Sequence, residues 1–380
     1  MGSLTLMVLA LTALAASAAA SDGVRFTSQA LYASGDAGRH TYRIPALAVT
    51  TRGTLLAFCE GRLGSSSDAG DIDLMLRRST DGGRSWSNLQ VVWSDGGNTC
   101  GNPCPVVDRA TGDIWLLATW NRGDDHEAQI IDQTSKDTRR VFALVSRDDG
   151  RSWDGPREIT PSVKLPDWTW YATGPGAAIQ LERGGHKGRL VVPCDHIEAE
   201  TKRYYSHVIF SDDHGRTWQL GGTTPRDKVN ECEVAELADG ALRLNMRSYD
   251  PALNARQTAI SHDGGATWTD QRIVPELVDP ICQASLRRLT WPARGKPGAL
   301  LFSNAASTRR ERMTVRASLD DGATWPVARL ISPAAAAYSC LAALPDGRIG
   351  LLYETGEKGP YERIDFATFG FDWLLQGVKQ

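Results

Sequence analysis

Short apolar runs alternate with polar, glycine-containing segments along most of the chain. Five polar segments share one pattern, and each follows an apolar run: 74–76, 141–145, 208–210, 259–260 and the stretch around Val315. Apolar runs of this length, bounded by Gly, Asp and Ser, are typical of β-strands that end in tight turns. The pattern therefore predicts an all-β protein built from many short strands.

The five polar segments follow the pattern S-x-D-x-G-x-[ST]-W. They occupy residues 79–86, 146–153, 211–218, 261–268 and 318–325, so successive copies start 67, 65, 50 and 57 residues apart. In such a segment Asp accepts backbone N–H groups, Gly supplies a positive φ angle, and Trp covers the apolar layer beneath. Each copy is therefore interpreted as a hairpin turn, here called an Asp-box. The boxes lack the acidic ligands of a calcium loop, so no metal site is expected in them.

A β unit repeated at this spacing is typical of a β-propeller. Roughly 360 residues divided by a period of about 60 gives six blades. Five blades carry an Asp-box, and strands from both termini are expected to complete the blade that lacks one. Residues 21–380 are accordingly predicted to form a single six-bladed domain.

The beginning of the chain differs from the rest. Residues 4–20 carry no charge and end in a string of small residues, which is typical of a secretory signal peptide (residues 1–20) cleaved after Ala18 or Ala20. This predicts an exported protein, whether secreted, periplasmic or lysosomal, with no later transmembrane segment. The 42 basic and 45 acidic side chains give a net charge of −3, which argues against a nucleic-acid partner.

Seven cysteines are spread along the chain, mostly in apolar stretches: Cys59, Cys100, Cys104, Cys194, Cys232, Cys282 and Cys340. Buried free thiols are the simplest interpretation. Pairing of Cys100 with Cys104 is the alternative in an oxidising compartment. No His accompanies that pair at a spacing suited to zinc.

Several motifs, taken together with the Asp-boxes, resemble those of the exo-α-sialidases (neuraminidases) of bacteria and animals. The resemblance runs from about Arg39 to the C-terminus. It includes Tyr42-Arg43-Ile44-Pro45, 102–108, 168–176, Asn230-Glu231, Arg247, Ser303-Asn304 and 338–341. Asp-boxes also occur in non-catalytic propellers, whereas the Arg-Ile-Pro motif combined with a Glu…Arg pair and a late Tyr is more specific.

The resemblance implies a set of catalytic residues. Tyr338 matches the nucleophile, Glu231 the base that takes its proton, and Asp68 the general acid/base. Neighbouring carboxylates compete with two of these positions, namely Glu233 and Glu236 with Glu231, and Asp71 and Asp73 with Asp68.

A triad of arginines is implied as well. Arg43, Arg247 and Arg310 match the residues that bind the substrate carboxylate. Arg309 and Arg312 remain alternatives to Arg310.

The chemistry of sialic acid explains these residue types. The sugar carries a carboxylate on its anomeric carbon, so a carboxylate nucleophile would meet like-charge repulsion, which a tyrosine avoids. Arginine supplies planar, bidentate partners for the sugar carboxylate. A free phenol has a pKa near 10, so the nearby arginines and Glu231 are expected to reduce the cost of ionising Tyr338.

Further positions are second-tier candidates. Arg62 is expected near the acid loop, and Asn102 matches a position that faces the 4-hydroxyl and N-acyl side of the sugar. Tyr171 and Trp170 are candidates for lining the glycerol or leaving-group side, or else pack within a blade. Many relatives carry a His where this chain has Ala177, so a specificity contact from that His is not expected here.

The resemblance thus implies retaining hydrolysis of terminal α-linked sialic acids on glycoproteins, glycolipids or oligosaccharides, with no metal or other cofactor. The alternatives are the same scheme acting on a deaminated sialic acid (2-keto-3-deoxynononic acid), a transglycosylating sialidase, and a non-catalytic propeller that binds glycans. A Ser or Cys hydrolase finds no support, because no His lies in a nucleophile-elbow context.

Overall fold

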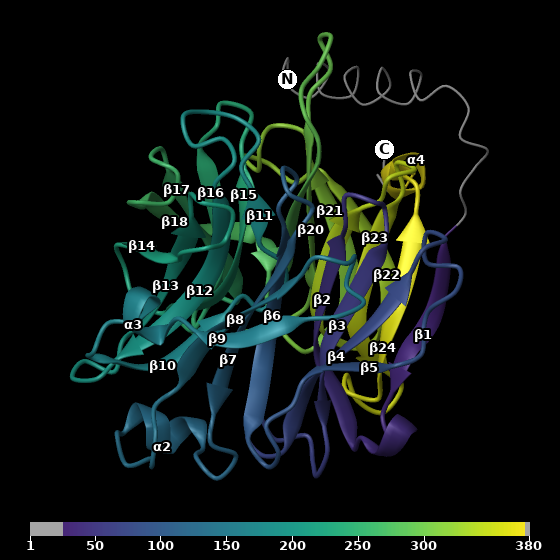
Figure 1. Ribbon diagram of the computed structural model, residues 1–380. Coiled ribbons are helices and arrows are strands. Elements are labelled where there is room, and N and C mark those ends of the chain that lie inside the picture. The colour runs from purple at the N-terminus through teal and green to yellow at the C-terminus, as the bar shows by residue number, and fades with distance from the viewer. Residues whose placement is uncertain (1–25, 377–380) are drawn as a thin grey trace.

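The computed structural model describes residues 26–376, and these residues consist mainly of β-strands and turns, as the sequence pattern predicts. Helices are few and short (Figure 1): η1 (Asp36–Gly38), α2 (Glu127–Ile131), α3 (Thr160–Val163) and α4 (Phe371–Leu375). No helix in this range is long and apolar enough to span a membrane. The predicted signal peptide lies outside the described residues.

The first strands pair into successive antiparallel runs of four. One run holds β2 (Thr41–Val49), β3 (Leu55–Arg62), β4 (Ile72–Ser79) and β5 (Gln90–Trp93). The next holds β6 (Thr99–Val107), β7 (Ile114–Asn121), β8 (Arg140–Ser146) and β9 (Asp154–Glu158). A single parallel bridge between Ile72 and Thr99 joins these two runs into one sheet.

The middle of the chain forms two separate sheets of the same kind. One contains β10 (Trp168–Thr173), β12 (Leu190–Glu198), β13 (Tyr204–Ser211) and β14 (Gln219–Thr223), with β11 (Ile179–Gln180) paired to β12. The other contains β15 (Val229–Glu236), β16 (Leu242–Ser248), β17 (Ala255–Ser261) and β18 (Thr269–Val278). In each case strands that are adjacent in the sheet follow one another along the chain, with β11 lying between β10 and β12 in sequence.

The last sheet contains two overlapping runs that share one long strand. β19 (Ser285–Thr290), β20 (Ala299–Ala305) and β21 (Glu311–Ser318) pair with the first part of β22 (Val327–Ala343). The second part of β22 pairs with β23 (Ile349–Gly356), followed by β24 (Arg363–Phe369) and β1 (Thr27–Ala33). β1 and β24 lie side by side (Figure 1), so strands from the two ends of the chain meet in this run, as predicted.

The five Asp-boxes share one hydrogen-bonded turn. In the second box, Ser146 Oγ donates to Asp148 Oδ1 at 2.9 Å and accepts the amide of Gly150, while Ser152 donates through its amide and hydroxyl to the two Asp148 oxygens. The Ser, Asp, Gly and Ser/Thr positions repeat these contacts in the other four boxes. The interpretation of the boxes as turns is therefore confirmed.

The tryptophans that end the boxes join neighbouring runs. Three pack onto an aromatic ring of the adjacent run: Trp86 on Phe366, Trp153 on Phe58 and Trp218 on Trp115, with ring centroids 4.9, 5.6 and 6.2 Å apart. Aromatic pairs of this kind add about 0.5–1.5 kcal/mol beyond the area they bury. The box thus closes its own hairpin and also holds its run against the next one.

All seven cysteines are buried and free, so Cys100 and Cys104 are not paired. Their strands carry them into the apolar interior. Burial raises the pKa of the Cys104 thiol well above its ordinary value, and acidic neighbours add to the effect. These thiols are therefore part of the packing of the core.

Glu233, one of the alternatives to Glu231, is fully buried in β15. It links β15 to β19 and to the segment that contains Ala177. Its Oε1 accepts the amide of Ala177 at 3.1 Å, and its Oε2 accepts the Ser285 hydroxyl at 2.8 Å and the Leu286 amide at 2.7 Å. Burial raises the pKa of Glu233 to about 7, although Arg287 and these hydrogen bonds act in the opposite direction.

This pKa predicts a pH dependence of stability. An unfolded Glu has a pKa of about 4.3, so between about pH 4.3 and 7 the folded chain holds a proton that the unfolded chain has released. The contribution of Glu233 to stability should fall as pH rises through this window, by up to about 1.4 kcal/mol per pH unit. In Glu233→Gln this slope should be absent, which urea unfolding between pH 5 and 8 measures.

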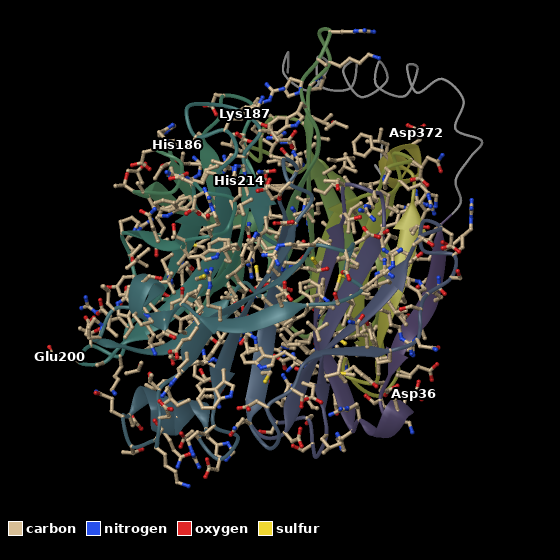
Figure 2. The ribbon with its side chains drawn as sticks, in the orientation of Figure 1. Asp36, His186, Lys187, Glu200, His214 and Asp372 are labelled. Atoms are coloured by element: carbon tan, nitrogen blue, oxygen red, sulfur yellow. The ribbon has the colours of Figure 1, made fainter. Side chains whose placement is uncertain are left out.

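Glu200→Gln is the matched control for this measurement, because Glu200 lies on the exposed turn between β12 and β13 (Figure 2). It should keep the pH slope of the unaltered chain. Parallel pH profiles for the unaltered chain and Glu233→Gln would show that Glu233 does not titrate in this range.

Candidate active site

Four strands are interrupted by β-bulges at the predicted site residues. The pairing register shifts between Arg43 and Ala46 in β2, and between residues 101 and 104 in β6, 229 and 232 in β15, and 336 and 339 in β22. Bulges change the direction of side chains in a strand. At these bulges the regular alternation of side chains is broken, and the side chains concerned are those of Arg43, Asn102, Glu231 and Tyr338.

Tyr338 and Glu231 are in direct hydrogen-bond contact. The Tyr338 hydroxyl donates to Glu231 Oε1 at 2.5 Å, and Arg247 Nη1 lies 2.6 Å from Glu231 Oε2 and 3.2 Å from Tyr338 Oη. All three side chains are nearly buried; the exposed fractions of Glu231 and Arg247 are 10% and 11%. A phenol, a carboxylate and a guanidinium thus form one connected unit.

The pKa of Tyr338 lies well above its ordinary value, chiefly because of burial and next because of the Glu231 carboxylate; Arg247 and Arg43 act in the opposite direction. The expectation for Glu231 therefore needs correction. As a neighbouring anion, Glu231 makes the phenolate less favourable in the free protein. Its hydrogen bond instead gives the phenolic proton a place to go as the oxygen reacts.

Arg43 is fixed by Glu354 of β23. Its Nε and Nη2 donate to the two Glu354 oxygens at 3.1 and 3.4 Å, and the same carboxylate accepts the amides of Ile44 and Tyr338 at 2.9 and 3.1 Å. The Arg43 guanidinium lies 5.0 Å from the Tyr338 ring centroid and 4.0 Å from that of Tyr361. Glu354 thereby anchors both the arginine and the bulge that carries Tyr338.

Arg310 approaches Tyr338 from the loop before β21. Its guanidinium lies 5.9 Å from the Tyr338 ring centroid, and it donates to the Tyr361 hydroxyl and to the Ile281 carbonyl. No carboxylate within residues 26–376 pairs with it at 4.0 Å or less. The alternative Arg309 is 80% exposed and pairs with Glu311, so it points away from the site.

Asp68 lies on the loop between β3 and β4 and is 64% exposed. Its Oδ1 is 2.7 Å from Arg62 Nη2 and 3.4 Å from Arg43 Nη1. Partial removal of water from the Asp68 carboxylate acts to raise its pKa, but Arg62 and Arg43 together hold the pKa below its ordinary value. Of the alternatives, Asp73 instead pairs with Arg39 at 2.6 Å.

Arg62 and Asn102 meet at Glu60, a residue that sequence reasoning did not select. Glu60 Oε2 accepts two Arg62 hydrogen bonds, at 3.0 and 2.6 Å, and its Oε1 accepts the Asn102 amide at 2.9 Å. The Asn102 side-chain oxygen accepts from Thr119 and from the buried Arg139. Both predicted residues therefore lie beside the Asp68 loop, held by a buried network.

Tyr171 is not brought to the site. Its side chain is fully buried in a core cluster with Trp168 and Cys194, and its ring lies 4.9 Å from that of His207. The prediction that it lines the substrate does not hold in this structure. The pairing of β10 with β12 shifts register between Trp168 and Tyr171, and both rings lie in the same core cluster. Trp170 lies on the other side of β10 and stacks on Arg139 at 4.0 Å.

Ala177, where a specificity contact was not expected, is likewise buried in the core. Its backbone amide bonds to Glu233, and its methyl group packs among apolar side chains. The side chain at this position thus carries no polar group, and the contact with Glu233 is made by the backbone amide.

Sequence reasoning missed four residues that shape the site: Glu60, Arg139, Glu354 and Tyr361. The only local signal was a charged residue inside an apolar strand, as in the Leu-Leu-Tyr-Glu354 and Phe-Cys-Glu60 segments. Glu127 of α2 was missed as well. Burial raises the pKa of Glu127, Arg139 acts in the opposite direction, and Asp68 and Glu231 raise it further.

The arrangement combines three kinds of group. Arg43, Arg247 and Arg310 surround one phenol and can receive an anion, the Tyr338 hydroxyl donates to a carboxylate, and Asp68 is an exposed carboxyl group on a loop. Within residues 26–376 no cluster of three or more His, Cys, Asp and Glu side chains is arranged to hold a metal ion. Such a set suits displacement at a carbon that lies next to a carboxylate.

Comparison with known proteins gives consistent matches. A BNR repeat-like domain model matches residues 53–351. A sialidase of Micromonospora viridifaciens is 38% identical over 92% of this chain and 54% of its own length. An exo-alpha-sialidase of Aspergillus fumigatus is 31% identical over 90% of this chain and 86% of its own length.

Solved structures agree in fold. The Hadza microbial sialidase Hz136 matches with a TM-score of 0.82 and 32% identity over 91% of this chain and 69% of that one. The intramolecular trans-sialidase of Ruminococcus gnavus matches with a TM-score of 0.77 and 20% identity over 93% and 99%.

The lengths of the relatives differ from that of this chain. It spans 54% and 61% of the sialidases of Micromonospora viridifaciens and Bacteroides fragilis, but 86% of the Aspergillus fumigatus enzyme. The matched domain covers most of the chain, and the Aspergillus fumigatus relative, 31% identical, is matched over 86% of its own length. The chain belongs to the sialidase family.

Proposed function

We propose that this chain is a retaining exo-α-sialidase that removes terminal α-linked sialic acids from glycoconjugates. The observation that carries the proposal is the 2.5 Å hydrogen bond from Tyr338 to Glu231 inside a ring of three arginines. A glycan-binding propeller needs no buried phenol–carboxylate pair of this kind. The relatives at 31–38% identity carry the names sialidase and exo-alpha-sialidase.

In this proposal the sugar carboxylate binds the three arginines. Glu354 balances Arg43 and Glu231 balances Arg247, whereas Arg310 has only a hydroxyl and a carbonyl as partners. Of the three arginines, Arg310 alone has no carboxylate partner among the described residues, so it can pair with the single negative charge of a sialic acid. Carboxylate binding also places the anomeric carbon beside Tyr338.

The proposed reaction has two displacements. Asp68 protonates the leaving oxygen while Tyr338 Oη attacks the anomeric carbon and passes its proton to Glu231, so the glycosidic bond breaks and a sialyl–tyrosine bond forms. Asp68, now a carboxylate, removes a proton from water, which attacks the same carbon; Tyr338 leaves and regains its proton from Glu231. Two inversions give net retention.

The fold proposal is a closed propeller of six blades. The successive four-stranded runs, the shared strand β22 and the pairing of β1 with β24 support it. The bulged strands β2, β6, β15 and β22 would be the inner strands of their blades. We also propose that residues 1–20 direct export and are then removed. Mass spectrometry of the N-terminal peptide of the exported protein tests this proposal.

The first experiment is release of a fluorogenic phenol from its α-N-acetylneuraminide. The unaltered chain should hydrolyse it, and Tyr338→Phe should lower kcat by about 10³-fold or more, because the nucleophilic oxygen is gone. Far-UV circular dichroism should show that the variant is folded. Unchanged turnover in folded Tyr338→Phe would remove Tyr338 from its role.

If the unaltered chain gives no release, the deaminated glycoside is tested next. Hydrolysis of that substrate alone would assign the alternative sugar. Analysis of products in the presence of lactose separates hydrolysis from transfer, since a transglycosylating enzyme yields sialyllactose. Failure with both sugars in a folded protein would favour the non-catalytic propeller.

Arg310→Ala tests the arginine site, and Arg309→Ala is its matched control. Loss of Arg310 removes a charge-assisted contact to the substrate carboxylate and should lower kcat/KM by about 10²-fold. Arg309 is exposed and outside the site, so its variant should stay within about twofold. Equal effects of the two substitutions would contradict the assignment.

Asp68→Asn tests the acid through the leaving group. The variant cannot donate a proton, so hydrolysis of sialyllactose, whose leaving alcohol needs protonation, should fall by about 10²–10⁴-fold. The aryl glycoside, whose phenol leaves readily, should lose much less in its first step. An equal loss for both substrates would show that Asp68 does not protonate the leaving oxygen.

A further inference from the structure

A cavity of about 460 Å³ opens at the opposite end of the inner strands from Tyr338. Its walls are the later residues of the strands that carry the site: 47–49 in β2, 105–107 in β6, 235–236 in β15 and 342–343 in β22. The Asp-boxes also lie at this end, because each follows the third strand of its run. Figure 2 shows His214 of the third box far from Asp36, which lies just before β2.

The charged groups of this cavity are mostly compensated. Arg109 pairs with Glu182 at 2.6 Å, and Arg288 pairs with Asp321 at 2.6 Å. The Glu236 carboxylate accepts two backbone amides, at 2.7 and 2.8 Å. These groups therefore need no additional partner of opposite charge.

Arg287 is the exception. No carboxylate within residues 26–376 lies within 4.0 Å of it, its Nη1 donates to the Ala178 carbonyl at 3.3 Å, and its Nε is buried without an acceptor. The Arg287 charge acts to lower the pKa of Glu233, but that carboxylate is itself engaged by three hydrogen-bond donors. A partly buried guanidinium without a counter-charge is costly, and an anion in the cavity would compensate it.

The rest of the wall selects the kind of anion. It combines apolar side chains with a few uncharged polar ones; the apolar residues include Leu47, Val49, Val106, Ile179, Ala342, Pro345 and Trp291, and the polar ones are Thr50, Thr51 and Gln180. The volume is within the range of small-molecule sites, which combine apolar walls with a few placed polar groups. A single planar guanidinium matches a carboxylate, whereas a doubly charged phosphate would need more donors.

We propose that this cavity is a second ligand site, separate from the active site, which binds a small organic monocarboxylate through Arg287. The apolar body of the ligand packs against the strand walls, and its carboxylate pairs with the guanidinium. The inference does not rest on the proposed sialidase activity, because none of the active-site side chains lines this cavity.

Benzoate is the probe for this site, and benzamide is its neutral counterpart of the same shape. Titration calorimetry at constant ionic strength should be done on Arg310→Ala protein, which weakens carboxylate binding at the arginines of the active site. Saturable benzoate binding with a Kd of about 1 mM or tighter is expected, with benzamide at least tenfold weaker. Equal binding of the two probes, or no saturable binding, would overturn the proposal.

Arg287→Gln in the same background should weaken benzoate at least tenfold, and Arg287→Lys should give an intermediate loss, because it keeps the charge but not the planar fork. Arg109→Gln is the matched control from the same cavity wall and should change the Kd by less than twofold. Benzoate binding that survives Arg287→Gln would show that the probe binds elsewhere.

Discussion

Three guanidinium groups converge on one phenol in this protein, and the site depends on how their mutual repulsion is balanced. Glu354 holds Arg43 and Glu231 holds Arg247, so two of the three charges are neutralised by the protein itself. Arg310 is held only by uncharged oxygens. The balance leaves the cluster stable without a ligand and still attractive to one anion, which is what recognition of a single carboxylate requires.

The bulges are the structural counterpart of this electrostatic balance. In a regular strand, successive side chains point to opposite faces of the sheet, so few of them could meet around Tyr338. Interrupting the pairing frees Arg43 and Tyr338 but also leaves backbone amides without strand partners. Glu354 accepts two of these amides, from Ile44 and Tyr338, while it holds the Arg43 guanidinium. The Glu354 carboxylate therefore both satisfies backbone amides at the bulges and fixes the positions of Arg43 and Tyr338.

The sequence could predict features whose residues lie close together along the chain, but not contacts between distant residues. An Asp-box closes within eight residues, so its turn chemistry is legible in the sequence, and the structure confirms it. The pairing of Arg43 with Glu354 joins residues 311 positions apart, and no pattern in a single sequence links them. Tyr171 was misplaced because its position depends on which face of β10 turns inward. The cost of ionising the Tyr338 phenol was misjudged because burial and the Glu231 carboxylate raise its pKa and together outweigh the arginines.

Asp68 and Tyr338 are coupled through Arg43. In the free protein Arg43 contacts Asp68 and lies beside the Tyr338 ring, so its charge favours ionised Asp68. An acid that must donate a proton needs the opposite condition. When a substrate carboxylate binds Arg43 it screens that charge and adds a negative one, and both effects raise the pKa of Asp68. In the proposed reaction, binding of the substrate would thus prepare Asp68 for protonation, and release of the sugar would return it to its ionised form. In this view the arginines serve catalysis twice, first by holding the sugar and then by setting the proton balance of the loop above it.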